Sequence, residues 1–210
     1  MRFADLDAVT LDANGTILRL TDPVRALAEL VRRHGVERSH EDVAHAFAAE
    51  VAYSRPRVLE GRDAASLADL RRRCADVFLG ALGAEGSRPG FAAGFAATLR
   101  FEPIPDIAAS LTAMRRRGLR LAVVSNWDVG LTDHLAAVGL GELFAEVVTS
   151  AEAGAEKPDP RIFRLALDRL SVRPERALHI GDEAIDEEGA RAAGMHFAPA
   201  PVADAVAAFA

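Results

Sequence analysis

The chain has 210 residues, of which 50% are hydrophobic and 27% charged, which describes a soluble globular protein of one domain with an insertion or two small domains. The net charge of −6 and the isoelectric point near 5.5 argue against a nucleic-acid partner, which would select for a basic patch. A single cysteine excludes an intrachain disulfide, and no apolar stretch is long enough to span a bilayer, so we expect a cytoplasmic protein without a membrane partner.

Short apolar segments along the chain are predicted to form the strands of a parallel sheet. Such segments, when they end in polar or glycine-containing turns, are typical of buried parallel strands. Four segments have this pattern, namely Ala8–Leu11, Leu119–Val124, Glu146–Thr149 and Ala177–Ile180. A fifth and weaker candidate is Met195–Ala198.

Helical patterns lie between these segments. Residues 105–117 place apolar side chains on one helical face and stop at Gly118, and residues 159–170 show the same spacing after an opening proline. Alternating strands and helices predict an α/β fold, a Rossmann-like parallel sheet with helices on both faces. In such sheets ligands bind beyond the carboxyl ends of the strands.

The interval from Leu18 to Arg100 shows no convincing strand and is predicted to form helices. The expected helices are Pro23–His34, Ser39–Tyr53, Ala64–Leu82 and Pro89–Leu99, separated by glycine and proline residues. A crossover of this length is a domain in itself. We therefore expect a helical cap of residues 18–99, inserted into an α/β core of residues 1–17 and 100–210.

Polar side chains follow the first two core strands of the chain. Asp12 comes directly after Ala8–Leu11, where a carboxylate can act as a nucleophile, although a turn-forming Asp has the same pattern. Thr16 adds a hydroxyl near a bound anion. Ser125 and Asn126 end the next strand, where they can hold an anion or simply cap a helix.

Two further polar positions lie at the same predicted edge. Lys157 is the only lysine among the 25 cationic residues and stands in a turn fixed by prolines. A compact ammonium can reach two anions in a way that a guanidinium does not imitate. Asp182 follows the fourth strand, with Asp186 beyond it, and carboxylates at this edge can hold Mg²⁺ together with Asp12.

In this order and placement, the four sites resemble the haloacid dehalogenase superfamily through essentially the whole core. The resemblance lies in Leu11–Leu18, Val123–Asn126, Lys157–Phe163, His179–Asp182 and Gly189–Met195. The stretches after Val124 and from Lys157 look closest to the phosphatase-like subgroup with a helical cap. The resemblance implies a hydrolase of small phosphorylated molecules.

The resemblance also implies a role for each site residue. Asp12 would be the nucleophile and a Mg²⁺ ligand. Ser125 would bind the phosphoryl oxygens, and Lys157 would neutralise both the nucleophile and the phosphate. Asp182 would ligate the metal, and Asp186, one layer further out, would help to orient the metal.

The sequence departs from the family at Asn14, where its phosphatases usually have a second Asp that acts as general acid and base. An amide cannot give up a proton, so acid–base assistance of about 10²–10⁴-fold is lost. The metal site need not suffer, because in the family this residue coordinates through its backbone carbonyl. Asn14 therefore remains a candidate metal ligand and a candidate catalytic residue.

Three hypotheses follow from this departure. The first is a Mg²⁺-dependent phosphatase that acts on phosphates with a good leaving group or takes its acid from the cap. The second is a 2-haloacid dehalogenase, whose branch also lacks the second Asp but does not use Mg²⁺ or normally keep an Asp like Asp182. The third is a catalytically weak binding or scaffold protein. Substrate identity, the cap residues that contact substrate, and the oligomeric state have no distinguishing signal in the sequence.

Overall fold

The computed structural model describes residues 3–84, 86 and 88–209, and the chain divides into two compact units. One unit combines Met1–Arg19 with Glu102–Ala210, and the other is Leu20–Phe101. The second unit lies two residues further along the chain, at each end, than the cap predicted at 18–99. Among the described residues, no helix has the length and apolarity needed to cross a membrane.

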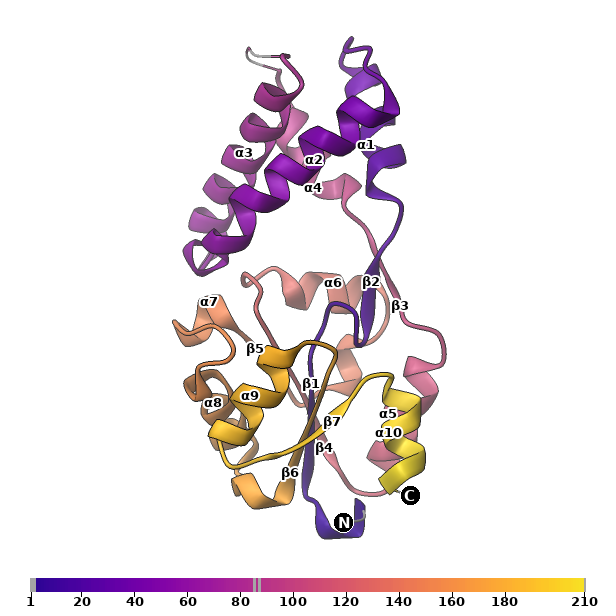
Figure 1. Cartoon of the computed structure of the whole chain (residues 1–210), viewed down its shortest axis with the longest axis vertical. Coiled ribbons are helices and arrows are strands. Elements are labelled where there is room, and N and C mark those ends of the chain that lie inside the picture. Colours follow the sequence, from indigo (N-terminus) through magenta and orange to yellow (C-terminus); the bar gives the residue numbers. More distant parts are fainter. Residues whose placement is uncertain (1–2, 85, 87, 210) are drawn as a thin grey trace. The chain divides into compact units, whose positions relative to one another are not determined.

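The larger unit is built on a five-stranded sheet in the order β5-β4-β1-β6-β7 (Figure 1), and every neighbouring pair is parallel. The predicted α/β fold is thereby confirmed. The strands are β1 (Ala8–Leu11), β4 (Arg120–Ser125), β5 (Glu146–Thr149), β6 (Ala177–Gly181) and β7 (His196–Pro199). Each lies within one residue of its prediction at either end.

Helices cover both faces of this sheet. α8 and α9 pack on one face, and α5 and α10 lie on the other (Figure 1). The helices are α5 (Ile107–Arg116), α6 (Leu131–Ala137), α7 (Ser150–Ala153), α8 (Pro160–Leu170), α9 (Ala184–Ala192) and α10 (Val202–Phe209). Short 3₁₀ turns complete the unit at Phe3–Asp5 (η1), Gly141–Leu143 (η3) and Pro174–Arg176 (η4).

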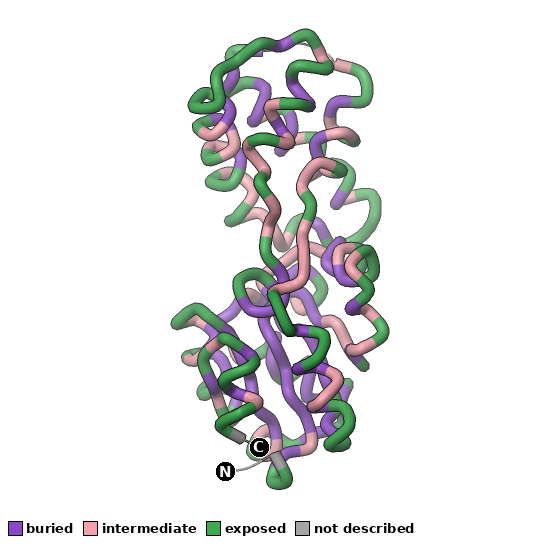
Figure 2. The backbone as a smooth tube through the Cα atoms, turned by 90° about the vertical axis from the view of Figure 1, so that its right-hand side faces the viewer, coloured by how far each residue is buried: buried purple, intermediate pink, exposed green. Residues whose placement is uncertain are grey.

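The layer between the sheet and α8 and α9 is almost wholly apolar. The three central strands β1, β4 and β6 are buried along nearly their whole length (Figure 2). Side chains that fill the layer include Ala122, Val124, Val148, Ile162, Phe163, Leu167 and Ala190. Gly189 of α9 permits this packing, because a Cβ there would overlap the ring of Phe163.

The described residues of the second unit form four α-helices at the predicted positions. They are α1 (Pro23–Arg33), α2 (His40–Ser54), α3 (Ala64–Ala81) and α4 (Phe91–Thr98), with a 3₁₀ segment η2 (Arg55–Glu60) between α2 and α3. Its core contains the rings of Phe78, Phe91 and Phe95, and the first and last of these lie 5.1 Å apart between centroids. The unit therefore has a hydrophobic core of its own.

The expectation that residues 18–100 contain no strand is wrong at one end. β2 (Leu18–Leu20) pairs with β3 (Phe101–Pro103) in a two-stranded sheet at the points where the chain enters and leaves the helical unit. Just beyond β2, the backbone N–H of Thr21 donates to the carbonyl of Arg100 at 2.9 Å. A three-residue strand is too short to show alternation, and its partner lies about eighty residues away, so the local pattern gave no signal.

Candidate active site

The order of the strands brings the predicted site together at one edge of the sheet. β1 lies between β4 and β6, and Leu11 at its end is in register with Val123 and Ile180. Asp12 follows immediately, with its backbone N–H donating to the carbonyl of Ile180 at 2.9 Å. The residues that end β4 and β6 therefore flank Asp12, at the point where the strand order reverses direction.

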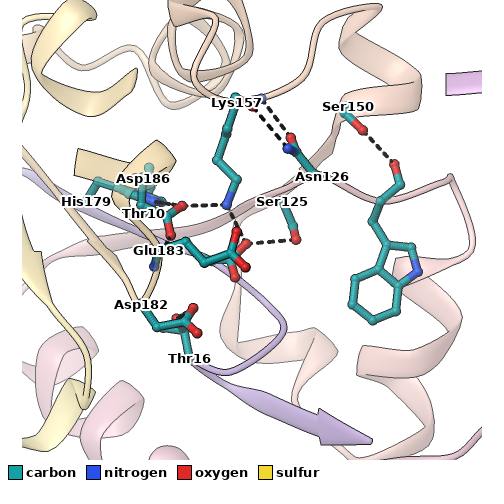
Figure 3. A network of polar contacts seen from close by, with 12 residues as sticks. Thr10, Thr16, Ser125, Asn126, Ser150, Lys157, His179, Asp182, Glu183 and Asp186 are labelled. Atoms are coloured by element: carbon teal, nitrogen blue, oxygen red, sulfur yellow. Dashed lines mark hydrogen bonds and ion pairs between the residues drawn. The ribbon is translucent and has the colours of Figure 1, made fainter. Parts of the chain in front are cut away.

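Three of the predicted residues form a buried polar chain around Asp12. The Asp12 Oδ1 atom accepts hydrogen bonds from Ser125 Oγ at 2.9 Å and from Lys157 Nζ at 2.5 Å. The same ammonium donates to Asp186 Oδ1, also at 2.5 Å. Figure 3 shows the Lys157 side chain extending between Asp186 and Ser125. One positive charge thus binds two carboxylates in a buried site.

The loop that carries Lys157 is held by Asn126. The Asn126 side chain accepts a hydrogen bond from the backbone N–H of Lys157 at 2.7 Å and donates to its carbonyl at 3.2 Å. Because both polar atoms of the amide bind this backbone, Asn126 positions the lysine from the end of β4. Sequence reasoning missed this contact and assigned Asn126 to the phosphate, an assignment that stays a prediction.

The two carboxylate oxygens of Asp186, in the first turn of α9, accept different hydrogen bonds. Its Oδ2 atom accepts the backbone N–H of Glu183 at 3.0 Å, which completes a capping box at the start of the helix. Its Oδ1 atom accepts from Lys157 and from His179 Nε2, the latter at 3.2 Å. Burial alone would raise the pKa of Asp186, but the His179 hydrogen bond and the Lys157 charge outweigh it and hold the pKa below its usual range.

Asp182 lies beyond β6 against the turn that follows Asp12. Thr16 Oγ1 donates to Asp182 Oδ1 at 3.1 Å, and these two side chains are neighbours in Figure 3. Gly15 makes the approach possible, because its φ is +83° and a Cβ there would overlap the Asp182 carboxylate. Burial and the nearby charge of Asp12 raise the pKa of Asp182, against the effect of the Thr16 hydrogen bond. Asn14 is exposed in the same turn.

The carboxylates of this edge fit a divalent cation. Asp12, Asp182 and Asp186 each offer an oxygen, and these oxygens lie within 4.8 Å of one another. Lys157 pairs with Asp12 and Asp186, so the three carboxylates of the cluster face one ammonium and their negative charge is only partly compensated. Because the Asp186 oxygens already accept three hydrogen bonds, Asp12 and Asp182 are the better candidates for direct ligands. Oxygen ligands of this kind suit Mg²⁺.

His179 lies inside the fold, as expected from its position in an apolar strand. Its side chain is fully buried, and its ring meets the ring of Phe163 edge-on at 4.9 Å between centroids. Burial lowers the pKa of His179, although the hydrogen bond to Asp186 opposes this effect, so the imidazole is neutral. What the sequence did not reveal is its contact with Asp186 behind the site.

Comparison with known proteins gives this arrangement a context. Haloacid dehalogenase-like hydrolase domain-containing protein 3 of Mus musculus is 46% identical over 103 residues, which are 49% of this chain and 41% of the relative. A phosphoserine phosphatase of Thermus thermophilus is 43% identical over 98 residues, 46% of this chain and 39% of the relative. The match thus spans about two fifths of each of these relatives.

A solved structure and a family profile extend the match to most of the chain. The structure of L-2-haloacid dehalogenase from Xanthobacter autotrophicus, with chloropropionic acid covalently bound, superposes with a TM-score of 0.67 at 28% identity. It covers 92% of this chain and 77% of the dehalogenase chain. The profile of the haloacid dehalogenase-like hydrolases matches residues 6–194. The chain therefore belongs to the haloacid dehalogenase-like hydrolase family.

Proposed function

We propose that this hydrolase is a Mg²⁺-dependent phosphatase of small phosphorylated molecules, with an aspartyl-phosphate intermediate on Asp12. The observation that carries the proposal is the position of Asp182, whose carboxylate lies beside that of Asp12 and is held there by Thr16. A second carboxylate next to the nucleophile can bind a cation, which phosphate hydrolysis in this proposal needs. Expulsion of a halide does not need one.

The buried ion pairs support the nucleophilic role of Asp12. Lys157 and Ser125 both donate to its Oδ1 atom, which fixes the orientation of the carboxylate for attack on phosphorus. Attack forms a bond from an Asp12 oxygen to phosphorus as the P–O bond to the leaving group breaks, and the leaving group departs as an anion that takes its proton from solvent. Water then hydrolyses the aspartyl phosphate and restores the carboxylate.

The phosphate would be bound by the same donors that orient the nucleophile. Lys157 would neutralise negative charge on the transferred group, and the Ser125 hydroxyl would donate to its oxygens. The cation, held by Asp12 and Asp182 with the backbone carbonyl of Asn14 as a candidate third ligand, would supply electrostatic stabilisation of the phosphoryl oxygens. Asp186 would act from behind by fixing Lys157.

Asn14 shapes the substrates that we expect. Its amide is exposed in the turn after Asp12 and can donate a hydrogen bond to a leaving oxygen but supplies no proton. We propose that the enzyme favours phosphates whose leaving group departs without protonation, such as aryl and acyl phosphates. The phosphoserine phosphatase relative supports a small phosphorylated substrate. We propose the helical unit as the cap that selects it.

Dehalogenation of a 2-haloacid is a second candidate function. It is favoured by the likeness to the L-2-haloacid dehalogenase structure over most of the chain, and by Asn14, since halide departure needs no acid. In that reaction Asp12 would attack carbon and form an ester. Lys157 and Ser125 could serve this nucleophile equally well, so the geometry around Asp12 alone does not separate the two reactions.

One assay panel distinguishes these functions. The full chain and its Asp12→Asn variant are each given an aryl phosphate, acetyl phosphate and 2-chloropropionate, with Mg²⁺ and with EDTA. We expect phosphate release that needs both Mg²⁺ and Asp12. Chloride release in EDTA would replace the phosphatase proposal with dehalogenation. Silence on all three substrates, without Mg²⁺ binding, would favour the binding or scaffold role.

A further inference from the structure

A buried polar pair interrupts the apolar layer behind the site. Thr10 and His179 are register partners on β1 and β6, both have no exposed surface, and Thr10 Oγ1 lies 2.8 Å from His179 Nδ1. Their neighbours in the layer are apolar, with Phe163 against the imidazole ring. Apolar side chains of similar size would fill this space without desolvating polar atoms, so the pair is not explained by core packing.

The hydrogen-bonding partners of His179 fix its tautomer. Asp186 Oδ1 already accepts from the Lys157 ammonium at 2.5 Å, so in its 3.2 Å contact with His179 the Nε2 atom carries the proton and donates it to the same oxygen. The Nδ1 atom is then an acceptor, and the Thr10 hydroxyl donates to it. Thr10 thereby selects the tautomer that can donate to Asp186.

The hydrogen bond from His179 fixes the Asp186 carboxylate, which in turn binds the Lys157 ammonium. The Oδ1 atom of Asp186 accepts from His179 on one side and from the Lys157 ammonium on the other, while Oδ2 is held by the backbone of Glu183. With these three donors in place the carboxylate has one orientation. Without the His179 donor, one constraint on the oxygen that holds the ammonium is lost.

We propose that His179, oriented by Thr10, is a positioning residue that fixes the Asp186 carboxylate and through it holds the Lys157 ammonium against Asp12. The hydrogen-bonded chain runs from Thr10 through His179, Asp186 and Lys157 to Asp12. His179 contacts neither the substrate nor the nucleophile in this assignment. Its effect on turnover rests on the proposed function, whereas its effect on Lys157 does not.

The single lysine of the chain makes this proposal directly measurable. Protein grown with lysine isotopically labelled at Cε gives one side-chain resonance, that of Lys157. The variants are His179→Phe, which removes the donor, His179→Gln, which keeps a donor for Asp186, and Thr10→Val, which removes the hydroxyl at constant shape. Leu167→Ala is the control, because Leu167 belongs to the same apolar layer and has no polar side-chain atom that could join the hydrogen-bonded chain.

We expect His179→Phe and Thr10→Val to shift the Lys157 resonance, and His179→Gln and Leu167→Ala to leave it near the wild-type position. In the aryl phosphate assay, kcat of His179→Phe should fall about tenfold or more with KM little changed, and His179→Gln should recover most of the loss. If His179→Phe does not fold, Thr10→Val and His179→Gln carry the comparison.

An unmoved resonance in folded His179→Phe or Thr10→Val would overturn the proposal, as would an equal shift in Leu167→Ala. His179→Gln matching His179→Phe in a folded protein would also overturn it. A shifted resonance in a protein that hydrolyses no phosphate would refute the proposed function and uphold the positioning role. The two failures are therefore distinguishable.

Discussion

Lys157 and Asp12 form a buried ion pair, with the ammonium 2.5 Å from the carboxylate and side chains that are 3% and 9% exposed. Asp186 lies at the same distance from the ammonium on its other side, with its side chain 1% exposed. Burial of charges is unfavourable unless each is paired, so the three groups depend on one another. Removal of Lys157 would leave two buried carboxylates without a counter-charge.

The first prediction concerns the shape of the cation. Lys157→Arg keeps the charge but replaces a compact ammonium with a planar guanidinium, which does not fit between two carboxylates in a closed site. We expect kcat to fall about 10²–10³-fold, the range seen when one electrostatic donor is lost. Arg161→Lys, the reverse exchange at an exposed position of the next helix, should leave turnover unchanged. Full activity of Lys157→Arg would contradict the role given to the ammonium.

The second prediction tests the missing acid. Asn14→Asp introduces a carboxyl at an exposed turn position two residues after the nucleophile, where the substitution meets little packing. We expect turnover of alkyl phosphates to rise about 10²-fold, while aryl and acyl phosphates change less. Asn14→Ala is the control and should bring no gain. Equal turnover in wild type and Asn14→Asp would mean that a proton donor comes from elsewhere.

The third prediction concerns the cation. Mg²⁺ binding to the folded protein alone should stabilise it by about 2.7 kcal/mol at a concentration of 100 times Kd. We expect the thermal midpoint of the wild type to rise with Mg²⁺ and that of Asp182→Asn to stay nearly constant. Asp168→Asn, an exposed carboxylate of α8, should respond as the wild type does. A full Mg²⁺ response in Asp182→Asn would exclude Asp182 as a ligand.

The fourth prediction concerns a carboxyl in the core of the helical unit. Glu50 is 5% exposed, and burial raises its pKa, although hydrogen bonds with Cys74 and Ser54 offset part of the effect. A carboxyl with a raised folded-state pKa adds stability that is fully present below its unfolded-state pKa of about 4.3 and is lost as pH rises through the folded value. At pH 7, above the unfolded-state pKa, the raised pKa of Glu50 therefore lowers the stability of the helical unit.

Glu50→Gln removes this ionisation and should raise the thermal midpoint at pH 7, with the gain shrinking as pH falls towards about 4. A gain of 1 kcal/mol corresponds to a shift of about 2–4 °C in a chain of this size. Glu37→Gln, an exposed position before α2, serves as the control and should shift the midpoint little at either pH. A gain that does not depend on pH would point to packing instead of ionisation.

Much of the fold was predictable because its signals are local. The segment Ala8–Leu11 is mostly apolar and is followed by Asp12, and the segments of β4 and β6 are likewise followed by polar residues, so these residues meet at one edge of a parallel sheet. The helix at Pro160–Leu170 was predictable from its apolar spacing and from the proline at its first position. These features require no knowledge of distant residues.

What could not be predicted depends on pairs of residues far apart in sequence. The contact of Asn126 with the backbone of Lys157 joins loops 31 residues apart, and Asn126 looks like an ordinary strand-end residue in the sequence. The partnership of Thr10 with His179 spans 169 residues and lies within two segments that appear simply apolar. Side-chain donors and acceptors show their partners only once the strand register is known.

The burial of Lys157 also means that chemical modification of its amine can be used to follow the accessibility of the site. The chain has no other side-chain amine, so amine-acylating reagents that modify most proteins over their whole surface have one side chain to reach here. That amine is 5% exposed and hydrogen-bonded to two carboxylates, so we expect it to react slowly unless the loop that carries it moves away from β4. The rate of acylation at this residue would therefore report how often the site opens, without any substrate being known.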